Sequence, residues 1–254
     1  MHAELRARLA GSGPRDIRSL GLPGGLSLLM LAPHPDDFDA IGVTLKFLAD
    51  NGHSLHVGVA RTGSGVEDAY RPGLTLAGKA DLREREQRDS ARFFGLPDRC
   101  LTFLSLANDS QDQPADNMAN RDRVGQFMQE KAPDIVFLPH GNDTNAGHQV
   151  IYSLFRQVAC RLRQPPAAWL IRDPKTLAMR ADLYLPFGEG EARWKAELLR
   201  FHDSQHQRNL RSRGHGFDER VLQVNRKIAK ELALEAPYAE AFEVELPDGA
   251  GTVR

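Results

Sequence analysis

The sequence predicts a Rossmann-like three-layer α/β/α sandwich with a mainly parallel sheet, and two observations carry this prediction. Apolar runs of strand length recur along the 254 residues, and longer amphipathic stretches with helical spacing separate them. Such alternation is typical of βαβ units, whose right-handed crossovers give a parallel sheet covered on both faces. No repeat, low-complexity tract or linker interrupts the pattern, so we expect a single domain over residues 1–254.

The individual elements follow from local patterns. The first strand is the run "LSLLMLA" at 26–32, and the helix after it, at 39–52, ends at the stop signal Gly52. A second strand at 54–60 and a Gly-rich loop precede a helix at 79–95 that ends at Gly95. Further strands are expected at 100–106, 134–140, 167–173, 181–187 and 238–246, and further helices at 117–131, from about 147, at 189–211 and at 217–234.

The charge balance argues against nucleic acid and anionic membranes as partners. Lys and Arg number 33 and Asp and Glu 34, so the net charge of -1 favours neither nucleic acid nor an anionic membrane. The basic stretch 193–213 has interspersed acids and lacks the interleaved aromatics of a single-strand stacking platform, which is typical of a solvated helix face.

The cellular location is predicted from the cysteines and the N-terminus. Cys100 and Cys160 form no metal-binding or redox pattern, which fits a reducing compartment. Charges occupy the place of a secretory apolar region, and the longest apolar run is far shorter than the ~20 residues of a membrane span. We therefore expect a cytoplasmic protein with no membrane span.

Acids and histidines follow the first strand in an unusual density. His34, Asp36, Asp37 and Asp39 lie within six positions, where like charges repel unless a cation compensates them. Alone, this segment could also be a turn before an acidic helix N-terminus. The second group after the fourth strand makes coincidence less plausible, because ligands in such sheets bind beyond the carboxyl ends of the strands.

The second group lies in "HGNDTNAGH", which contains His140, Asp143 and His148. Two histidines and an aspartate are a suitable ligand set for catalytic Zn²⁺, with a position left for water. His34 and Asp37 can face one point from a tight turn, while Asp36 between them points elsewhere. A carboxylate beside the metal, and not bound to it, is what a general base requires.

An ordered set of motifs resembles one family. "APHPDDFDAIG" resembles the "AHPDDE" signature of the LmbE-like, or PIG-L, family of zinc-dependent N-acetylglucosamine deacetylases. "REREQRDSARFFGLPDRCLTFLSL" is similar to a later family segment, with Arg83, Glu86, Ala91 and Gly95 in step. "HDSQ" at 202–205 and "YAEAF" at 238–242 resemble the late "HxSQ" and "yaEaF". One departure is Phe38, where the family has Glu.

The resemblance implies roles for the site residues. His34 and Asp37 would bind zinc, or another divalent metal, and Asp36 would be the general base. The family's compact "HxDH" is longer here, by four residues between Asp143 and the second histidine. We assign His148 to the metal because a helix is expected to begin around it and to hold it rigidly, and His140 to stabilisation of the transition state, although the two could be exchanged. Asp143 would orient an imidazole.

The function that the resemblance implies is removal of an N-acetyl or similar N-acyl group from an amino-sugar substrate. The alternative is a non-catalytic or nucleotide-binding Rossmann-like protein, although no G-x-G-x-x-G follows the first strand and Walker A is absent. The sequence names neither the sugar nor the acyl group. Similar proteins include trimers and hexamers, so a homo-oligomer stays open.

Overall fold

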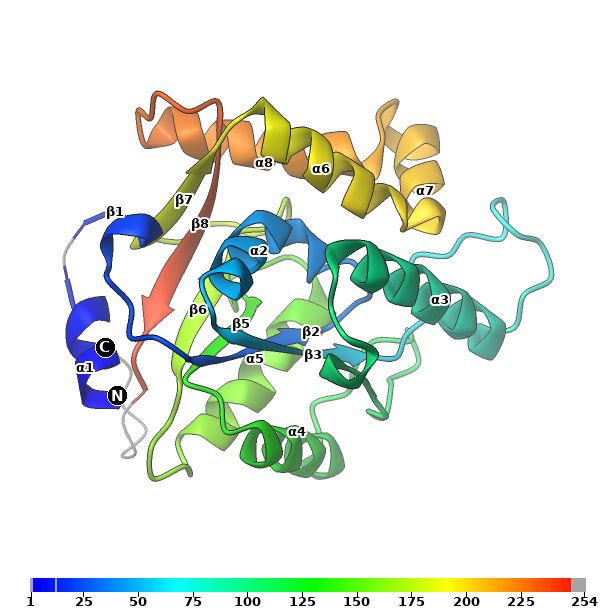
Figure 1. The fold of residues 1–254 in the computed structure, drawn as a ribbon. Coiled ribbons are helices and arrows are strands. Elements are labelled where there is room, and N and C mark those ends of the chain that lie inside the picture. Colours follow the sequence, from blue (N-terminus) through cyan, green and yellow to red (C-terminus); the bar gives the residue numbers. More distant parts are fainter. Residues whose placement is uncertain (1, 12, 248–254) are drawn as a thin grey trace.

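The structure is a computed structural model, which describes residues 2–11 and 13–247 (Figure 1). One eight-stranded sheet has the order β1-β7-β8-β6-β5-β2-β3-β4. The strands are β1 (Arg15–Asp16), β2 (Ser27–Ala32), β3 (Ser54–Ala60), β4 (Leu101–Leu104), β5 (Ile135–Pro139), β6 (Ala167–Ile171), β7 (Leu183–Phe187) and β8 (Tyr238–Glu245). Only β8 is antiparallel to its neighbours, β6 and β7. The mainly parallel sheet is confirmed.

The helices lie on both faces of this sheet, as Figure 1 shows. They are α1 (His2–Leu9), α2 (Gly42–Asp50), α3 (Leu76–Phe94), α4 (Met118–Lys131), α5 (Ala146–Ala159), α6 (Glu189–Arg200), α7 (Asp203–Arg213) and α8 (Phe217–Glu231). Helices α4 and α5 cover one face, and α2, α3, α6 and α8 cover the other. The three-layer sandwich that the sequence predicts is therefore present.

Strand β2 shows why the sheet is covered twice. Leu28 and Met30 belong to the hydrophobic core under α2 and α6, whereas Leu29 and Leu31 belong to the core under α4 and α5. Successive side chains of a strand point to opposite faces, so a strand apolar at every position needs a layer on each side. Each such side chain contributes about 1.5–3 kcal/mol when it is removed from water.

The helix predicted over 189–211 is wrong in one respect, because it is two helices. The helix is interrupted at His202, whose φ of -85° and ψ of 60° are not helical. Glu86 accepts from the amide and hydroxyl of Ser204, both at 2.7 Å, in the first turn of α7. A carboxylate at a helix N-terminus is favoured by the helix dipole, so α7 has its own stabilised start.

Two N-terminal elements, α1 and β1, were not predicted, since their residues show no amphipathic pattern. Cys100 and Cys160 are free and half-buried. Across the described part of the chain, every helix is too short or too polar to cross a membrane.

Candidate functional site

A tight turn directly after β2 carries the first candidate residues. The backbone amide of His34 donates to Asp37 Oδ2 at 2.8 Å, which closes the turn. Asp36 within it has a φ of 123°, a left-handed value that costs a non-glycine residue about 1–3 kcal/mol. The turn directs the carboxylates of Asp36 and Asp37 toward different partners, on α3 and α5 respectively.

His148 reaches this turn from the first turn of α5. Asn145 caps the helix by accepting from the amide of Gly147 at 3.0 Å. His148 Nε2 then lies 3.4 Å from Asp37 Oδ1, while His34 Nδ1 lies 3.3 Å from Asp37 Oδ2. The structure thus places the three predicted ligands together, with one donor atom from each within 4.8 Å of the others.

The electrostatics of this buried group favour a cation. Burial alone would raise the pKa of Asp37, but the neighbouring His148 and His34 hold it well below its usual range. Burial would lower the pKa of His148, yet the charge of Asp37 and the hydrogen bond to Asp143 raise it to about 10. Carboxylates therefore draw positive charge into the group, and its two imidazole nitrogens and carboxylate are ligands that a divalent metal such as zinc accepts.

Asp143 lies behind His148, as a residue that orients an imidazole would. Its Oδ2 lies 3.1 Å from His148 Nδ1 and also accepts from the Thr176 hydroxyl at 3.3 Å. With Nδ1 bonded to a carboxylate, Nε2 is left to face Asp37. Asp173, just beyond β6, completes a second possible donor group with Asp143 and His148. Its pKa is raised, chiefly by burial.

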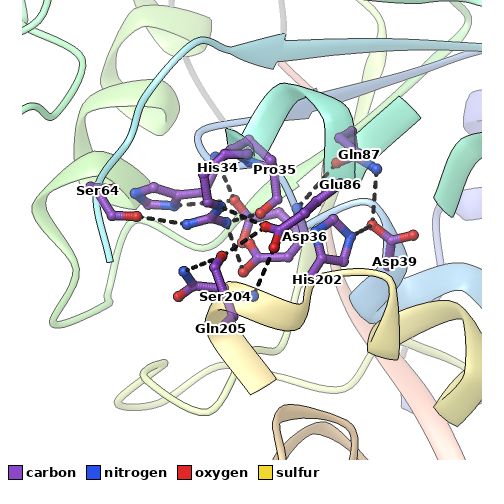
Figure 2. A network of polar contacts seen from close by, with 12 residues as sticks. His34, Pro35, Asp36, Asp39, Ser64, Glu86, Gln87, His202, Ser204 and Gln205 are labelled. Atoms are coloured by element: carbon purple, nitrogen blue, oxygen red, sulfur yellow. Dashed lines mark hydrogen bonds and ion pairs between the residues drawn. The ribbon is translucent and has the colours of Figure 1, made fainter. Parts of the chain in front are cut away.

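Asp36 points instead toward α3. Arg83 Nη2 lies 3.0 Å from Asp36 Oδ2 and also donates to the carbonyl of Pro35, and Nη1 donates to the carbonyl of Ser64 at 2.6 Å (Figure 2). The Asp36 amide donates to Gln87 Oε1 at 3.1 Å. Arg83 is buried, so a rigid cation fixes one oxygen of Asp36. The other oxygen has no hydrogen-bond donor among residues 2–11 and 13–247.

Phe38 and Asp39 occupy the place where the sequence departs from the family signature. Phe38 is fully buried and packs edge-on against Phe94, with ring centroids 4.9 Å apart. Asp39 Oδ2 accepts from His202 Nε2 at 2.7 Å and from Gln87 Nε2 at 3.0 Å, as Figure 2 shows. Burial would lower the pKa of His202, but Asp39 outweighs it and raises that pKa. His202 therefore ties the α6–α7 junction, through Asp39, to the turn at residues 34–37.

His140 has its contacts away from His34, Asp37 and His148. Its Nε2 lies 3.4 Å from Glu243 Oε2 on β8, its Nδ1 accepts from the Asn142 amide at 2.9 Å, and its ring stacks on Tyr152. In the sheet order, β8 lies beyond β6, on the side of β5 opposite to β2. His140 therefore faces away from His34, and its role in catalysis stays a prediction.

Comparison with solved structures finds proteins of similar fold. N,N'-diacetylchitobiose deacetylase from Pyrococcus horikoshii is similar in structure, with a TM-score of 0.69 and 18% identity over 86% of this chain and 83% of that one. 4-Carboxy-2-hydroxymuconate hydratase from Pseudomonas putida has a TM-score of 0.66 and 16% identity, over 86% and 95%. A teicoplanin-pathway deacetylase reaches 0.62 and 14%, over 85% and 97%. At these identities the likeness shows the fold.

No curated protein sequence matches the chain. A family model does match: residues 29–159, from β2 through α5, fit the model for GlcNAc-PI de-N-acetylase. This span is more than half of the 254 residues and contains the whole His34, Asp37 and His148 group. The chain therefore belongs to the PIG-L family.

Proposed function

We propose that this protein is a metal-dependent hydrolase that removes an N-acetyl or similar N-acyl group from an amino-sugar substrate. The observation that carries the proposal is the buried group of His34, Asp37 and His148 at the carboxyl ends of β2 and β5. Membership of the PIG-L family supports the reaction type. The deacetylases among the similar structures support it as well.

His34, Asp37 and His148 would hold the metal. When bound, a divalent metal such as zinc would lower the pKa of a bound water and polarise an acyl carbonyl. Asp36 would take the proton of the attacking water through Oδ1, because Arg83 holds Oδ2. The water oxygen bonds to the acyl carbon, the C–N bond breaks, and Asp36 returns the proton to the departing amine.

Stabilisation of the oxyanion by His140 is a further prediction within this proposal. Both of its ring nitrogens contact the chain's own groups, so His140 would have to leave Glu243 to reach a substrate. The cytoplasmic location likewise stays a prediction.

The test is a screen of N-acetylated amino sugars for release of a primary amine, with and without a chelator. Asp36→Asn should retain stoichiometric metal and the wild-type far-UV spectrum but lose nearly all turnover. Asp37→Asn is the matched control, because it changes the adjacent carboxylate and should lose metal together with activity. Loss of metal in Asp36→Asn would overturn the division of roles.

The rival function, a non-catalytic or nucleotide-binding protein, predicts a different result. It would be favoured if wild-type protein held no zinc or other divalent metal after reconstitution and elemental analysis. Metal binding without amine release from any substrate in the screen would instead leave the centre in place and reject the hydrolase.

A further inference from the structure

Gln113, to which no role has been assigned so far, contacts the ring of His34 from the loop between β4 and α4. Gln113 Oε1 lies 2.9 Å from His34 Nε2, in a half-buried contact. This is the ring nitrogen remote from Asp37, since Nδ1 is the one that lies 3.3 Å from Asp37 Oδ2. His34 thus has a polar partner on each side of its ring.

We propose that Gln113 is a positioning residue that fixes the orientation and tautomer of His34 for binding a divalent metal through Nδ1. A neutral imidazole carries one hydrogen, and the nitrogen that lacks it supplies the lone pair to a metal. An amide oxygen only accepts, so it holds the hydrogen on Nε2 and leaves the Nδ1 lone pair toward Asp37 and His148. The inference rests on the proposed metal centre.

The same arrangement is present at His148. There Asp143 Oδ2 lies 3.1 Å from Nδ1 and leaves Nε2 toward Asp37. Each of the two imidazoles therefore has an acceptor on its outer nitrogen, and the inner nitrogens both face one carboxylate. A hydrogen-bonded outer nitrogen on each histidine ligand is a general feature of protein metal sites.

The loop that carries Gln113 is well anchored. The amide of Gln113 donates to Asp109 Oδ1 at 3.0 Å, and its carbonyl accepts from the Asp109 amide at 2.7 Å. The neighbouring Asp112 accepts from the amide of Gly63 at 2.7 Å and from the hydroxyl of Thr62 at 2.6 Å. A side chain on such a support can hold a ligand in place, which a mobile loop residue cannot.

Gly147 provides the space for this contact. A Cβ at position 147 would lie 2.6 Å from Gln113 Oε1 and 3.0 Å from His34 Nε2. Contacts so short require a neighbour to move. The first turn of α5, which presents His148, is therefore also the surface against which the Gln113 amide and the His34 ring pack.

The proposal is tested by zinc affinity, measured by competition with a chromogenic chelator on metal-stripped protein. Gln113→Leu should bind zinc about 10–100-fold more weakly than wild type, the usual cost of removing such a partner. Gln113→Glu keeps an acceptor at the same reach and should bind at least as tightly as wild type. Gln111→Leu is the matched control, because Gln111 is exposed in the same loop, and it should not change the affinity.

The cobalt-substituted proteins give a second readout, since the visible spectrum reports the ligand geometry. Gln113→Leu should change that spectrum, and Gln113→Glu should retain it. The positioning role would be overturned if Gln113→Leu bound zinc as tightly as the wild type does, or if Gln113→Leu and Gln113→Glu lost affinity equally. Zinc binding by the wild-type protein would still support the proposed function in either case. Absence of zinc binding by the wild type would overturn both.

Discussion

The buried ion pair of Lys195 and Glu240 gives a sharp test of how α6 and β8 are joined to the start of α2. Lys195 lies on α6 and Glu240 on β8, and their side chains are 0% and 1% exposed. The ammonium donates to Glu240 Oε1 at 2.6 Å, to Asn225 Oδ1 at 2.8 Å and to the carbonyl of Ala40 at 2.6 Å. All three of its hydrogens are therefore used, one of them by Ala40, just after the turn at residues 34–37.

Glu240 is equally satisfied, because its oxygens also accept from the amides of Val43 and Thr44 at 3.2 and 2.7 Å, at the start of α2. Burial nevertheless lowers the pKa of Lys195, although the negative charges of Glu240 and Asp39 act to raise it. The pairing therefore does not fully compensate for the loss of water around the ammonium. Such a pair adds little net stability, but removal of one partner leaves a buried charge and costs about 3–5 kcal/mol.

We accordingly expect Lys195→Met and Glu240→Gln each to lower the free energy of unfolding by about 3–5 kcal/mol. The double variant should lose about 1–3 kcal/mol less than the sum of the two, because the second change removes the uncompensated group left by the first. Urea unfolding followed by far-UV circular dichroism measures all three. Lys230→Met, at an exposed lysine of α8, is the control and should stay within about 0.5 kcal/mol of wild type. Additive losses, or single losses under about 1 kcal/mol, would refute the reasoning.

Three further outcomes are expected. His202 has a raised pKa in the folded protein, so its contribution to stability is complete below pH 6.5 and is lost as pH rises through the folded value; the stability gap between wild type and His202→Gln should therefore narrow as the pH is raised above 6.5 in urea unfolding, and a constant gap would contradict this. Phe38→Ala should cost about 3–5 kcal/mol by the same assay, and the family's residue, in Phe38→Glu, should cost at least as much because a carboxylate would replace the ring against Phe94. His140→Gln should keep its zinc by elemental analysis and lower kcat by about 10²–10³-fold, the range for one lost oxyanion contact; a fall of less than ~10-fold with metal retained would reject the catalytic role.

The sheet and its edges could be predicted because their signals are local. Continuous apolar runs such as 26–32 and 134–140 require burial on both faces, and parallel strands bring their carboxyl ends to one edge. That logic is sufficient to place His34 and Asp37 opposite His148. Asp173 was within reach of the same logic, since it follows β6, the other neighbour of β5. The apolar run expected as a strand at 167–173 includes Asp173, so the pattern does not mark it as a residue beyond the strand end.

Side-chain direction is where sequence reasoning stops. His140 follows β5, which has β2 on one side and β6 on the other, and the strand's end alone does not say toward which neighbour the ring turns. Gln113 lies in a loop without periodicity, and its contact with His34 depends on the fold of that loop. The break at His202 is likewise decided by a tertiary partner, Asp39, which lies 163 positions away in the chain. Tertiary contacts of this kind override local helix propensity.

The fold does not by itself choose between hydrolysis and hydration, because the similar structures include both a deacetylase and a hydratase. Both reactions need a water made nucleophilic beside a base, and Asp36 with the His34, Asp37 and His148 group could serve either one. Asp36→Asn would therefore abolish both activities and cannot separate them. The difference lies in the product: an amide loses an amine, whereas an alkene acid only gains water. Amine release from an N-acetylated sugar, lost with the chelator, is the observation that decides for the hydrolase.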